Sequence, residues 1–301
     1  MSLTPLEKAV LDDYRAGSAF VPRSGDDTAD WTRFGLRALL DAGGPVRAGR
    51  LGTGDVEIKG DGSPVTRLEL EIEERLARSL ERFEPGASFV GEELGGKLSD
   101  EGWSLAVDPV DGTWAFVGRT ETFTTTLSVF RDGDPFLGLV SNPATGEIGY
   151  ATKDGATRIL QLSVFGEDDE AQLLPIPGAG SGPVLVNAHP GRAAAPLIAR
   201  LYEAWADGEV RMVRSPGGSP AWALLEAAKG SFVYVNLWSK RPAAAYDLAA
   251  GGLLVRGAGG EVTGLDGTPI DLVSHAGPFV AAVDQERRQT VTELLQATVS
   301  R

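Results

Sequence analysis

The stretch SLAVDPVDGTWAF, residues 104–116, places two aspartates three residues apart, Asp108 and Asp111, directly after an apolar run. The run at 105–107 has the composition of a buried strand. Open α/β sheets bind their ligands at the ends of such strands. We therefore expect a buried strand that presents two carboxylates at its tip.

The loop between the acids favours a binding role. Pro109 restricts the backbone, so we expect the Val110 carbonyl to face the same point as Asp108, with Asp111 returning to that point. Gly112 and Thr113 then begin a helix-like segment at 113–118, whose free N–H groups suit a phosphate. An Asp-Gly-Thr triplet taken alone is more often only a turn with a helix cap, and that reading stays open.

Three further acidic clusters stand in the chain: Glu69 in VTRLE, Glu92 and Glu93 in FVGEELGG, and Asp247 in AYDLAAG. Each alone is also typical of a solvated acid or, for Asp247, of a helix N-cap. Gathered carboxylates repel one another and raise each other's pKa unless a cation holds them. Hard divalent cations such as Mg²⁺ prefer oxygen ligands, so the clusters together indicate a metal site.

Composition limits the partners. The chain of 301 residues has a formal net charge of −14 and an isoelectric point near 4.7, without a basic run, which argues against nucleic acid. It contains no cysteine, which excludes disulfides and thiolate ligands. No apolar run approaches the roughly 18 residues of a membrane span, and the N-terminus lacks a signal-peptide pattern. We expect a cytoplasmic protein that binds no membrane.

The spacing of apolar residues predicts an α/β fold in two parts. Helices are expected at 5–22 and 29–42, a turn at 60–66, a helix at 67–83 and short strands from 88 to 162. The Gly/Pro-rich patch at 173–183 is the best boundary. We expect an α+β half at 1–175 that carries most metal ligands, and an α/β half at 176–301 that carries Asp247 and the specificity loops.

The second part alternates strands and helices. Strands are predicted at 184–188, 210–215 and 231–236, helices at 193–206, 220–230 and 243–259, and a final strand and helix after them. This alternation indicates an α/β layer.

Four signatures occur in a fixed order between Lys59 and Asp266: GDGSPVT…E, GEE, DPVDGT and YDLAAGGLLVRGAGG. In these the chain resembles the inositol monophosphatase superfamily. The resemblance implies a layered αβαβα sandwich, commonly dimeric. It also implies Mg²⁺-dependent, lithium-sensitive hydrolysis of a small phosphorylated metabolite.

The resemblance also implies a ligand set for two or three Mg²⁺ ions. Glu92, Asp108 and the Val110 carbonyl would hold the first ion, and Asp108, Asp111 and Asp247 the second. Glu92 would also touch a weaker third ion. Two ions of this kind clamp the attacking and leaving oxygens of an in-line displacement.

The same resemblance assigns catalytic and phosphate-binding roles. Thr113, assisted by Glu69 and by Glu92 at the metal, would orient or deprotonate the attacking water, and the N–H groups of Gly112 and Thr113 would hold the phosphate. Phosphoryl transfer asks a protein mainly for positioning and charge neutralisation, which this set supplies.

Departures from the family pattern bear on the substrate. Glu69 stands where the family usually has the shorter Asp, and Tyr246 where it usually has Trp. Asn236 is nearest to the position at which inositol-specific members carry a glutamate that accepts sugar hydroxyls. The case for inositol 1-phosphate in particular is therefore loosened.

Other residues are candidates for contacts to the substrate. Gly218 and Ser219 resemble the family's contact to the substrate alcohol, although Ser219 is equally well placed to cap the following helix. Arg214, Lys240 and Arg241 would favour a second anionic group, unless they are merely solvated.

The leading prediction is hydrolysis of a small phosphomonoester, and alternatives remain. Within the same fold, these are a 3′(2′),5′-bisphosphate nucleotidase and a histidinol-phosphate phosphatase. The missing lysine after Ser219 counts against the nucleotidase. A catalytically silent, metabolite-binding member is the alternative of another class, and the presence of all the acids counts against it.

Overall fold

The computed structural model describes residues 3–18, 23–51, 56–58, 64–162, 170–173, 183–187, 193–215, 217, 219–237 and 245–299. Its helices are α1 (Pro5–Arg15), α2 (Asp27–Leu51), α3 (Arg67–Phe83), α4 (Thr113–Val117), α5 (Ala195–Ala206), α6 (Pro220–Ala228), α7 (Ala245–Gly257) and α8 (Gln285–Val299). Its strands up to residue 173 are β1 (Val56–Ile58), β2 (Pro64–Thr66), β3 (Ser88–Gly91), β4 (Trp103–Asp111), β5 (Thr124–Arg131), β6 (Asp134–Asn142), β7 (Glu147–Thr152), β8 (Arg158–Gln161) and β9 (Glu170–Leu173). The later strands are β10 (Val184–Asn187), β11 (Val213–Arg214), β12 (Val233–Asn236), β13 (Glu261–Gly264) and β14 (Phe279–Ala282).

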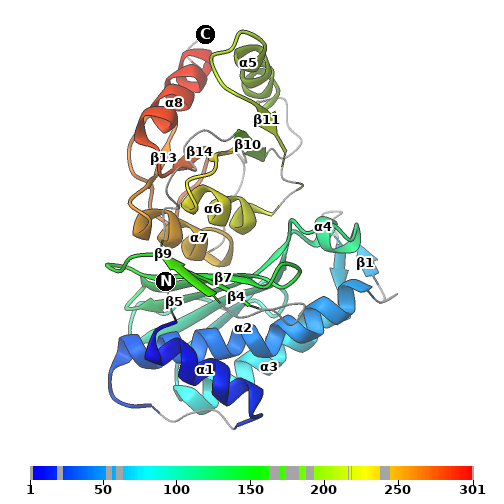
Figure 1. The fold of residues 1–301 in the computed structure, drawn as a ribbon, viewed down its shortest axis with the longest axis vertical. Coiled ribbons are helices and arrows are strands. Elements are labelled where there is room, and N and C mark those ends of the chain that lie inside the picture. Colours follow the sequence, from blue (N-terminus) through cyan, green and yellow to red (C-terminus); the bar gives the residue numbers. More distant parts are fainter. Residues whose placement is uncertain are drawn as a thin grey trace.

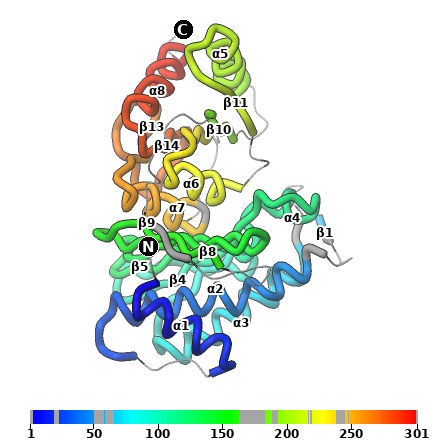
Figure 2. The backbone as a smooth tube through the Cα atoms, in the orientation of Figure 1, coloured from blue at the N-terminus to red at the C-terminus, as the bar shows by residue number. Residues whose placement is uncertain are grey.

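The elements stack in five layers, which Figure 1 shows from bottom to top. Helices α2 and α3 pack on the outer face of a seven-stranded sheet, and α1 packs on α2. Helices α6 and α7 lie between this sheet and a five-stranded sheet, and they contact both. Helices α5 and α8 cover the far side of the second sheet (Figure 2). This arrangement is the predicted αβαβα sandwich.

Both sheets are mixed. The first has the order β3-β4-β5-β6-β7-β8-β9, in which β3 and β4 are parallel and the other neighbours antiparallel. The second has the order β11-β10-β12-β14-β13, with β10 parallel to both of its neighbours. The strands β1 and β2 form a separate antiparallel pair.

Strand β4 lies next to the edge strand β3, and both of its faces are covered. Leu105, Ala106 and Val107 are fully buried, as the continuous apolar run predicts for a strand between two helical layers. On its outer side, Trp31 of α2 makes edge contacts with Phe83 of α3, their ring centroids 4.8 Å apart. Such aromatic pairs contribute about 0.5–1.5 kcal/mol beyond the burial of their area.

On the other side of the first sheet, a helix lies almost directly on the strands. A Cβ atom at Gly138 of β6 would stand 2.7 Å from the Cα atom of Ala250 in α7. A side chain at residue 138 would therefore push the middle layer away from the sheet.

Two helix boundaries differ from the prediction. Helix α1 ends at Arg15 rather than at residue 22, because Gly17 takes a left-handed conformation with φ of +65°. Helix α2 continues to Leu51 and passes through Pro45, although we expected an end near residue 42. Val46 beyond the proline is fully buried, so tertiary packing outweighs the low helix propensity of this segment.

Other boundaries differ as well. The turn predicted at 60–66 contains β2, and residues 59–63 lie outside the described residues. The strand expected at 210–215 is reduced to two residues, and the single strand expected near the end is an antiparallel pair, β13 and β14. The division of the chain at residue 175 falls within 174–182, also outside the described residues, and it stays a prediction.

No helix in the described part of the chain combines the length and the apolar character that crossing a membrane requires.

Candidate active site

Strand β4 contains both aspartates of the opening motif rather than ending before them. Asp108 pairs with Thr126 and Asp111 with Thr124 of β5, and the ladder is irregular between the two pairs. This bulge takes Pro109 and Val110 out of the regular ladder. Both aspartates are buried, with 2% and 4% of their surface exposed, so the expectation that they stand exposed at a tip was wrong.

The bulge is held by hydrogen bonds at its centre. The backbone N–H of Val110 donates to Oδ1 of Asp108 over 2.8 Å, and the Thr125 hydroxyl donates to the Pro109 carbonyl over 2.7 Å. The first of these bonds holds the Asp108 carboxylate against the backbone N–H of Val110. That the Val110 carbonyl ligates the same ion as Asp108 stays a prediction.

Asp111 connects this loop to the middle helical layer. Its Oδ2 atom accepts hydrogen bonds from the Ser219 hydroxyl (2.8 Å), the Ala221 N–H (2.7 Å) and the Thr124 hydroxyl (3.3 Å). Its Oδ1 atom accepts none among the residues that the structure describes. Burial, together with the charge of Glu92, raises the pKa of Asp111 to about 7 against these bonds.

Gly112 is required by its position. It caps α4 in a left-handed conformation with φ of 89°, and a Cβ atom there would lie 2.7 Å from the Cβ of Ser219. Helix α4 follows at Thr113, so the predicted helix-like segment is confirmed. The phosphate-binding role of Gly112 and Thr113 stays a prediction.

Thr113 and Glu69 meet as the resemblance implies. The Thr113 hydroxyl lies 3.3 Å from Oε1 of Glu69 and 3.2 Å from the Val110 carbonyl oxygen, to either of which it can donate. Glu69 is 1% exposed at the start of α3, and its Oε2 accepts from the N–H (2.5 Å) and hydroxyl (2.8 Å) of Thr66. Burial raises the pKa of Glu69 to about 7, although the Thr66 bonds act against this rise. The longer side chain of Glu69 thus still reaches Thr113.

Glu92 begins the turn after β3, and its N–H donates to the Val107 carbonyl of β4 over 3.2 Å. Burial is the main cause of the raised pKa of Glu69 and of Asp111, and the negative charge of Glu92 adds to the rise in both. The sequence analysis overlooked Glu73, which accepts from the backbone of this turn. The signal was present, because Glu73 lies one helical turn after Glu69.

Two predicted residues lie wholly or partly outside the described part of the chain. Gly218 lies outside the described residues, and so does the side chain of Asp247, the third residue of α7. The Tyr246 carbonyl before it accepts from the hydroxyl of Thr126, the ladder partner of Asp108, over 2.8 Å. The backbone of α7 at Asp247 therefore lies beside residues 108–111, which we call the aspartate loop.

Ser219 has the capping role that we considered beside substrate contact. Its hydroxyl accepts from the Trp222 N–H over 3.1 Å at the start of α6, and the residue is fully buried. The same hydroxyl also donates to Oδ2 of Asp111. A contact from Ser219 to a substrate stays a prediction.

Asn236 is the last residue of β12, buried next to Asn187, the last residue of the parallel strand β10. The side-chain nitrogen of Asn187 has no hydrogen-bond partner within the described part of the chain, and sequence analysis did not single it out. Arg214 in β11 is exposed, and Lys240 and Arg241 lie outside the described residues.

The donor set fits magnesium. The predicted ligands offer only carboxylate and carbonyl oxygen, which Mg²⁺ prefers, and a cation would offset the burial and repulsion that raise the pKa of Asp111. No three acidic or histidine side chains of the described residues converge as an ion site by themselves. The complete predicted set also needs Asp247.

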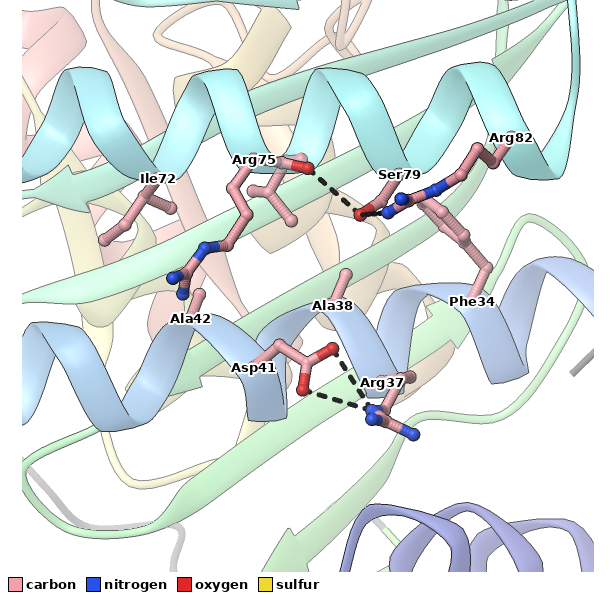
Figure 3. A pocket seen from close by; sticks show the side chains of 10 residues that line it. Phe34, Arg37, Ala38, Asp41, Ala42, Ile72, Arg75, Ser79 and Arg82 are labelled. Atoms are coloured by element: carbon pink, nitrogen blue, oxygen red, sulfur yellow. Dashed lines mark hydrogen bonds and ion pairs between the residues drawn. The ribbon is translucent and has the colours of Figure 1, made fainter. Parts of the chain in front are cut away.

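A separate hollow lies on the outer helical layer (Figure 3). It encloses about 320 Å³ between α2 and α3, and its rim carries Arg37, Arg75 and Arg82. Arg37 is bound to Asp41 by its Nε atom, 3.1 Å from each carboxylate oxygen. None of the predicted site residues lines this hollow, so it is distinct from the candidate active site.

Comparison with known proteins decides the family. Residues 30–300 match the model of the inositol monophosphatase family. The chain belongs to this family. It is therefore a phosphomonoesterase of the inositol monophosphatase family, as the four signatures predicted.

Two relatives differ in the substrates that their names give. A histidinol-phosphatase of Mycobacterium tuberculosis is 30% identical over 268 residues, which cover 85% of this chain and 95% of that protein. An inositol-1-monophosphatase of Caulobacter vibrioides is 28% identical over 253 residues, covering 80% and 91%. The relatives therefore leave the substrate of this family member open.

Solved structures confirm the fold. An inositol monophosphatase of Thermotoga maritima superposes with a TM-score of 0.72 at 22% identity, covering 91% of this chain and 98% of its own. An inositol monophosphatase of the cyanobacterium Anabaena superposes with a TM-score of 0.66 at 20% identity, covering 88% and 94%. The predicted layered α/β sandwich is the fold of these proteins.

Proposed function

We propose that the protein hydrolyses a small phosphomonoester with two or three Mg²⁺ ions, by in-line attack of an activated water. The observation that carries this proposal is the contact of the Thr113 hydroxyl with both Glu69 and the aspartate loop. The Thr113 hydroxyl stands within hydrogen-bond distance of both the Glu69 carboxylate and the Val110 carbonyl, next to Asp108 and Asp111.

The proposed metal ligands are the side chains of Glu92, Asp108, Asp111 and Asp247 and the carbonyl of Val110. When bound, Mg²⁺ supplies charge neutralisation at the phosphate and lowers the pKa of its water. Asp111 retains Oδ1 for this role because its Oδ2 is occupied by three donors.

The protein's own residues then move the proton and hold the phosphate. Thr113 accepts a proton from the attacking water while its own hydroxyl proton passes to Oε1 of Glu69. A pKa of Glu69 near 7 suits a group that takes up a proton at neutral pH. The N–H groups of Gly112 and Thr113 bind the phosphate oxygens.

The alcohol part of the substrate is proposed to meet the second sheet. Asn236, at the carboxyl end of β12, would supply an amide, and Gly218 and Ser219 are the other proposed contacts. Since Ser219 donates to Asp111, its contact to the alcohol requires the lone pairs of its oxygen.

A Mg²⁺-dependent assay with p-nitrophenyl phosphate tests the proposal on the wild type and on Asp111→Asn. We expect the variant to lose at least about 10²-fold in rate, since even partners outside a metal's ligand set contribute 10–100-fold. Asp266→Asn, an exposed acid that caps its own turn through Thr268, is the matched control. Equal activity of wild type and Asp111→Asn, or no activity in either, would contradict the two-metal proposal and favour a silent member.

Histidinol phosphate is the second candidate substrate. It is favoured by the Mycobacterium tuberculosis relative, and by Trp114, which is 61% exposed directly after Thr113. An indole there offers a face for an imidazole ring. Phosphate release from histidinol phosphate, inositol 1-phosphate, fructose 1,6-bisphosphate and adenosine 3′,5′-bisphosphate distinguishes the candidates.

We also propose that the protein forms a homodimer, is inhibited by lithium, and acts in the cytoplasm. These proposals rest on the family and on the absence of cysteine from the sequence. Sedimentation and a lithium titration of the phosphatase activity test the first two.

A further inference from the structure

Helix α3 carries two buried carboxylates one turn apart, Glu69 and Glu73, which are 1% and 0% exposed. The acids on its outer side differ: Glu71 and Glu74 are exposed and form surface pairs with Arg67 and Arg78. Glu69 has its place in the proposed reaction. Glu73 has none so far, although a buried acid needs partners that stabilise its charge.

Both carboxylate oxygens of Glu73 bind the turn that carries Glu92. Oε1 accepts from the Glu93 N–H over 2.9 Å, and Oε2 accepts from the Leu94 N–H over 2.8 Å. Hydrogen bonds to an ionised acceptor are roughly twice as strong as neutral ones. The two bonds from one rigid helix therefore fix the orientation of two consecutive peptide groups.

The turn closes tightly around this carboxylate. The backbones of Gly91 and Gly95 exchange two hydrogen bonds, of 2.9 and 3.0 Å. A Cβ atom at Gly91 would lie 2.0 Å from Oε2 of Glu73. The sequence Gly-Glu-Glu-Leu-Gly thus leaves room for a carboxylate inside the turn.

The other side of the turn is held by β4. The Glu92 N–H donates to the Val107 carbonyl, one residue before Asp108. Glu92 therefore stands between two anchors, one on the strand of the aspartate loop and one on α3. Apolar packing alone would not orient the N–H groups of residues 93 and 94, whereas a bidentate acceptor does.

We propose that Glu73 is a positioning residue that fixes the 92–94 backbone, so that the Glu92 carboxylate is held at the place where it ligates Mg²⁺. This inference rests on the proposed function, because it takes Glu92 as a metal ligand. Glu73 itself touches neither the ion nor the substrate.

Direct titration of the full-length protein with Mg²⁺ in a calorimeter, without substrate, tests the proposal. Glu73→Gln removes the charge and turns an NH₂ group toward one of the N–H donors. Glu73→Asp keeps the charge but shortens the side chain, so that it cannot reach both donors. We expect both variants to bind Mg²⁺ about tenfold more weakly. At saturating Mg²⁺, their kcat should stay within about threefold of the wild type.

Comparison of Glu73→Asp with Glu73→Gln distinguishes a role in positioning the turn from an effect of the negative charge alone. If Glu73→Asp binds Mg²⁺ as tightly as the wild type, the positioning role is wrong and only the negative charge matters. Glu74→Gln, one residue along the same helix and exposed, should bind as the wild type does. Should neither Glu73 variant fold, Gly91→Ala decides, because its Cβ displaces the carboxylate: unchanged Mg²⁺ affinity there overturns the proposal.

The same measurements distinguish a failure of the proposed function from a failure of the proposed role of Glu73. A wild-type protein that binds no Mg²⁺ and releases no phosphate contradicts the metal mechanism itself. A wild type that binds Mg²⁺, with Glu73 variants that match it, contradicts only the role of Glu73.

Discussion

Gly112 and Ser219 touch across two layers of the molecule: a Cβ atom on Gly112 would stand 2.7 Å from the Cβ of Ser219. Gly112 follows β4 of the first sheet, and Ser219 caps α6 of the middle layer. The Ser219 hydroxyl also donates to Asp111, so the contact and the hydrogen bond lock the same two segments together. The aspartate loop is thus shaped by a helix that lies about a hundred residues later in the chain.

Gly112→Ala tests this contact. The added methyl group meets Ser219 and must also adopt a φ of 89°, so we expect a loss of about 3 kcal/mol in unfolding free energy and a large loss of activity. Gly102→Ala is the matched control, with a φ of +74° and nothing within 4 Å. It should cost about 1 kcal/mol and keep full activity. Urea unfolding and kcat/KM measure both; similar effects at the two positions would contradict a role for the contact.

Thr113 is predicted to act through its hydroxyl. Thr113→Ala removes the donor to Glu69 and should lower kcat about 10²-fold without weakening Mg²⁺ binding, whereas Thr113→Ser should keep most of the activity. Thr120→Ala, which removes a hydroxyl bonded to the Ala115 carbonyl, is the control in the same segment. If Thr113→Ser is as slow as Thr113→Ala, the hydroxyl is not the acting group.

Magnesium binding should release protons near neutral pH. Burial raises the pKa of Asp111 and of Glu69 to about 7, so each carboxyl is about half protonated at pH 7. Because a bound cation favours the ionised form, the two groups together should release on the order of one proton. The release should vanish about two pH units higher, and the Mg²⁺ affinity should rise with pH up to that point. Calorimetry in buffers of different ionisation enthalpy measures the number of protons released on Mg²⁺ binding. Asp111→Asn should remove part of this proton release.

The N-terminal helix should confer acid sensitivity. Burial alone would raise the pKa of Glu7, but hydrogen bonds from Arg158, Tyr150 and Thr4 outweigh it and hold the pKa below its usual value. The stabilisation is therefore present above the usual pKa of a glutamate and is lost as the pH falls through the lowered one. Glu7→Gln should cost about 3–5 kcal/mol at pH 7, because it leaves Arg158 without its charge partner. The difference from the wild type should shrink in acid; a constant difference across urea titrations from pH 7 to 3 would contradict the account.

Trp114 should discriminate between substrates. If its exposed ring stacks on an imidazole, Trp114→Ala should raise the KM for histidinol phosphate about fivefold and that for inositol 1-phosphate much less. Trp205→Ala, 40% exposed on α5, is the control. An equal rise for both substrates would assign Trp114 to the fold or to phosphate binding instead.

The sequence predicted strand β4 as a buried strand that leads into the two aspartates, because short-range pattern decides this feature. The apolar run at 105–107 requires burial on two faces, Pro109 has a fixed φ, and Gly112 is the residue type that readily takes the left-handed conformation found there. The pairing of Thr113 with Glu69 could be predicted only through the family resemblance, since 44 residues separate them.

Long-range contacts explain what could not be predicted. The extension of α2 beyond Pro45 depends on the burial of Val46 against other elements, which no local pattern reports. The bond between Ser219 and Asp111 joins residues 108 positions apart, so the sequence could not choose between a cap and a substrate contact. Glu73 lies one helical turn after Glu69 in the sequence, but the fold is needed to show that both acids face inward.

The close approach of Gly138 to Ala250 has a consequence for how relatives can diverge. Helix α7 lies on β6 with no room for a side chain at residue 138, and its own start lies beside the aspartate loop. Substitutions that thicken this seam would move the backbone of α7 at Asp247 relative to Asp108. Over evolutionary time, family members that exchange one phosphorylated substrate for another should therefore retain small residues at the seam.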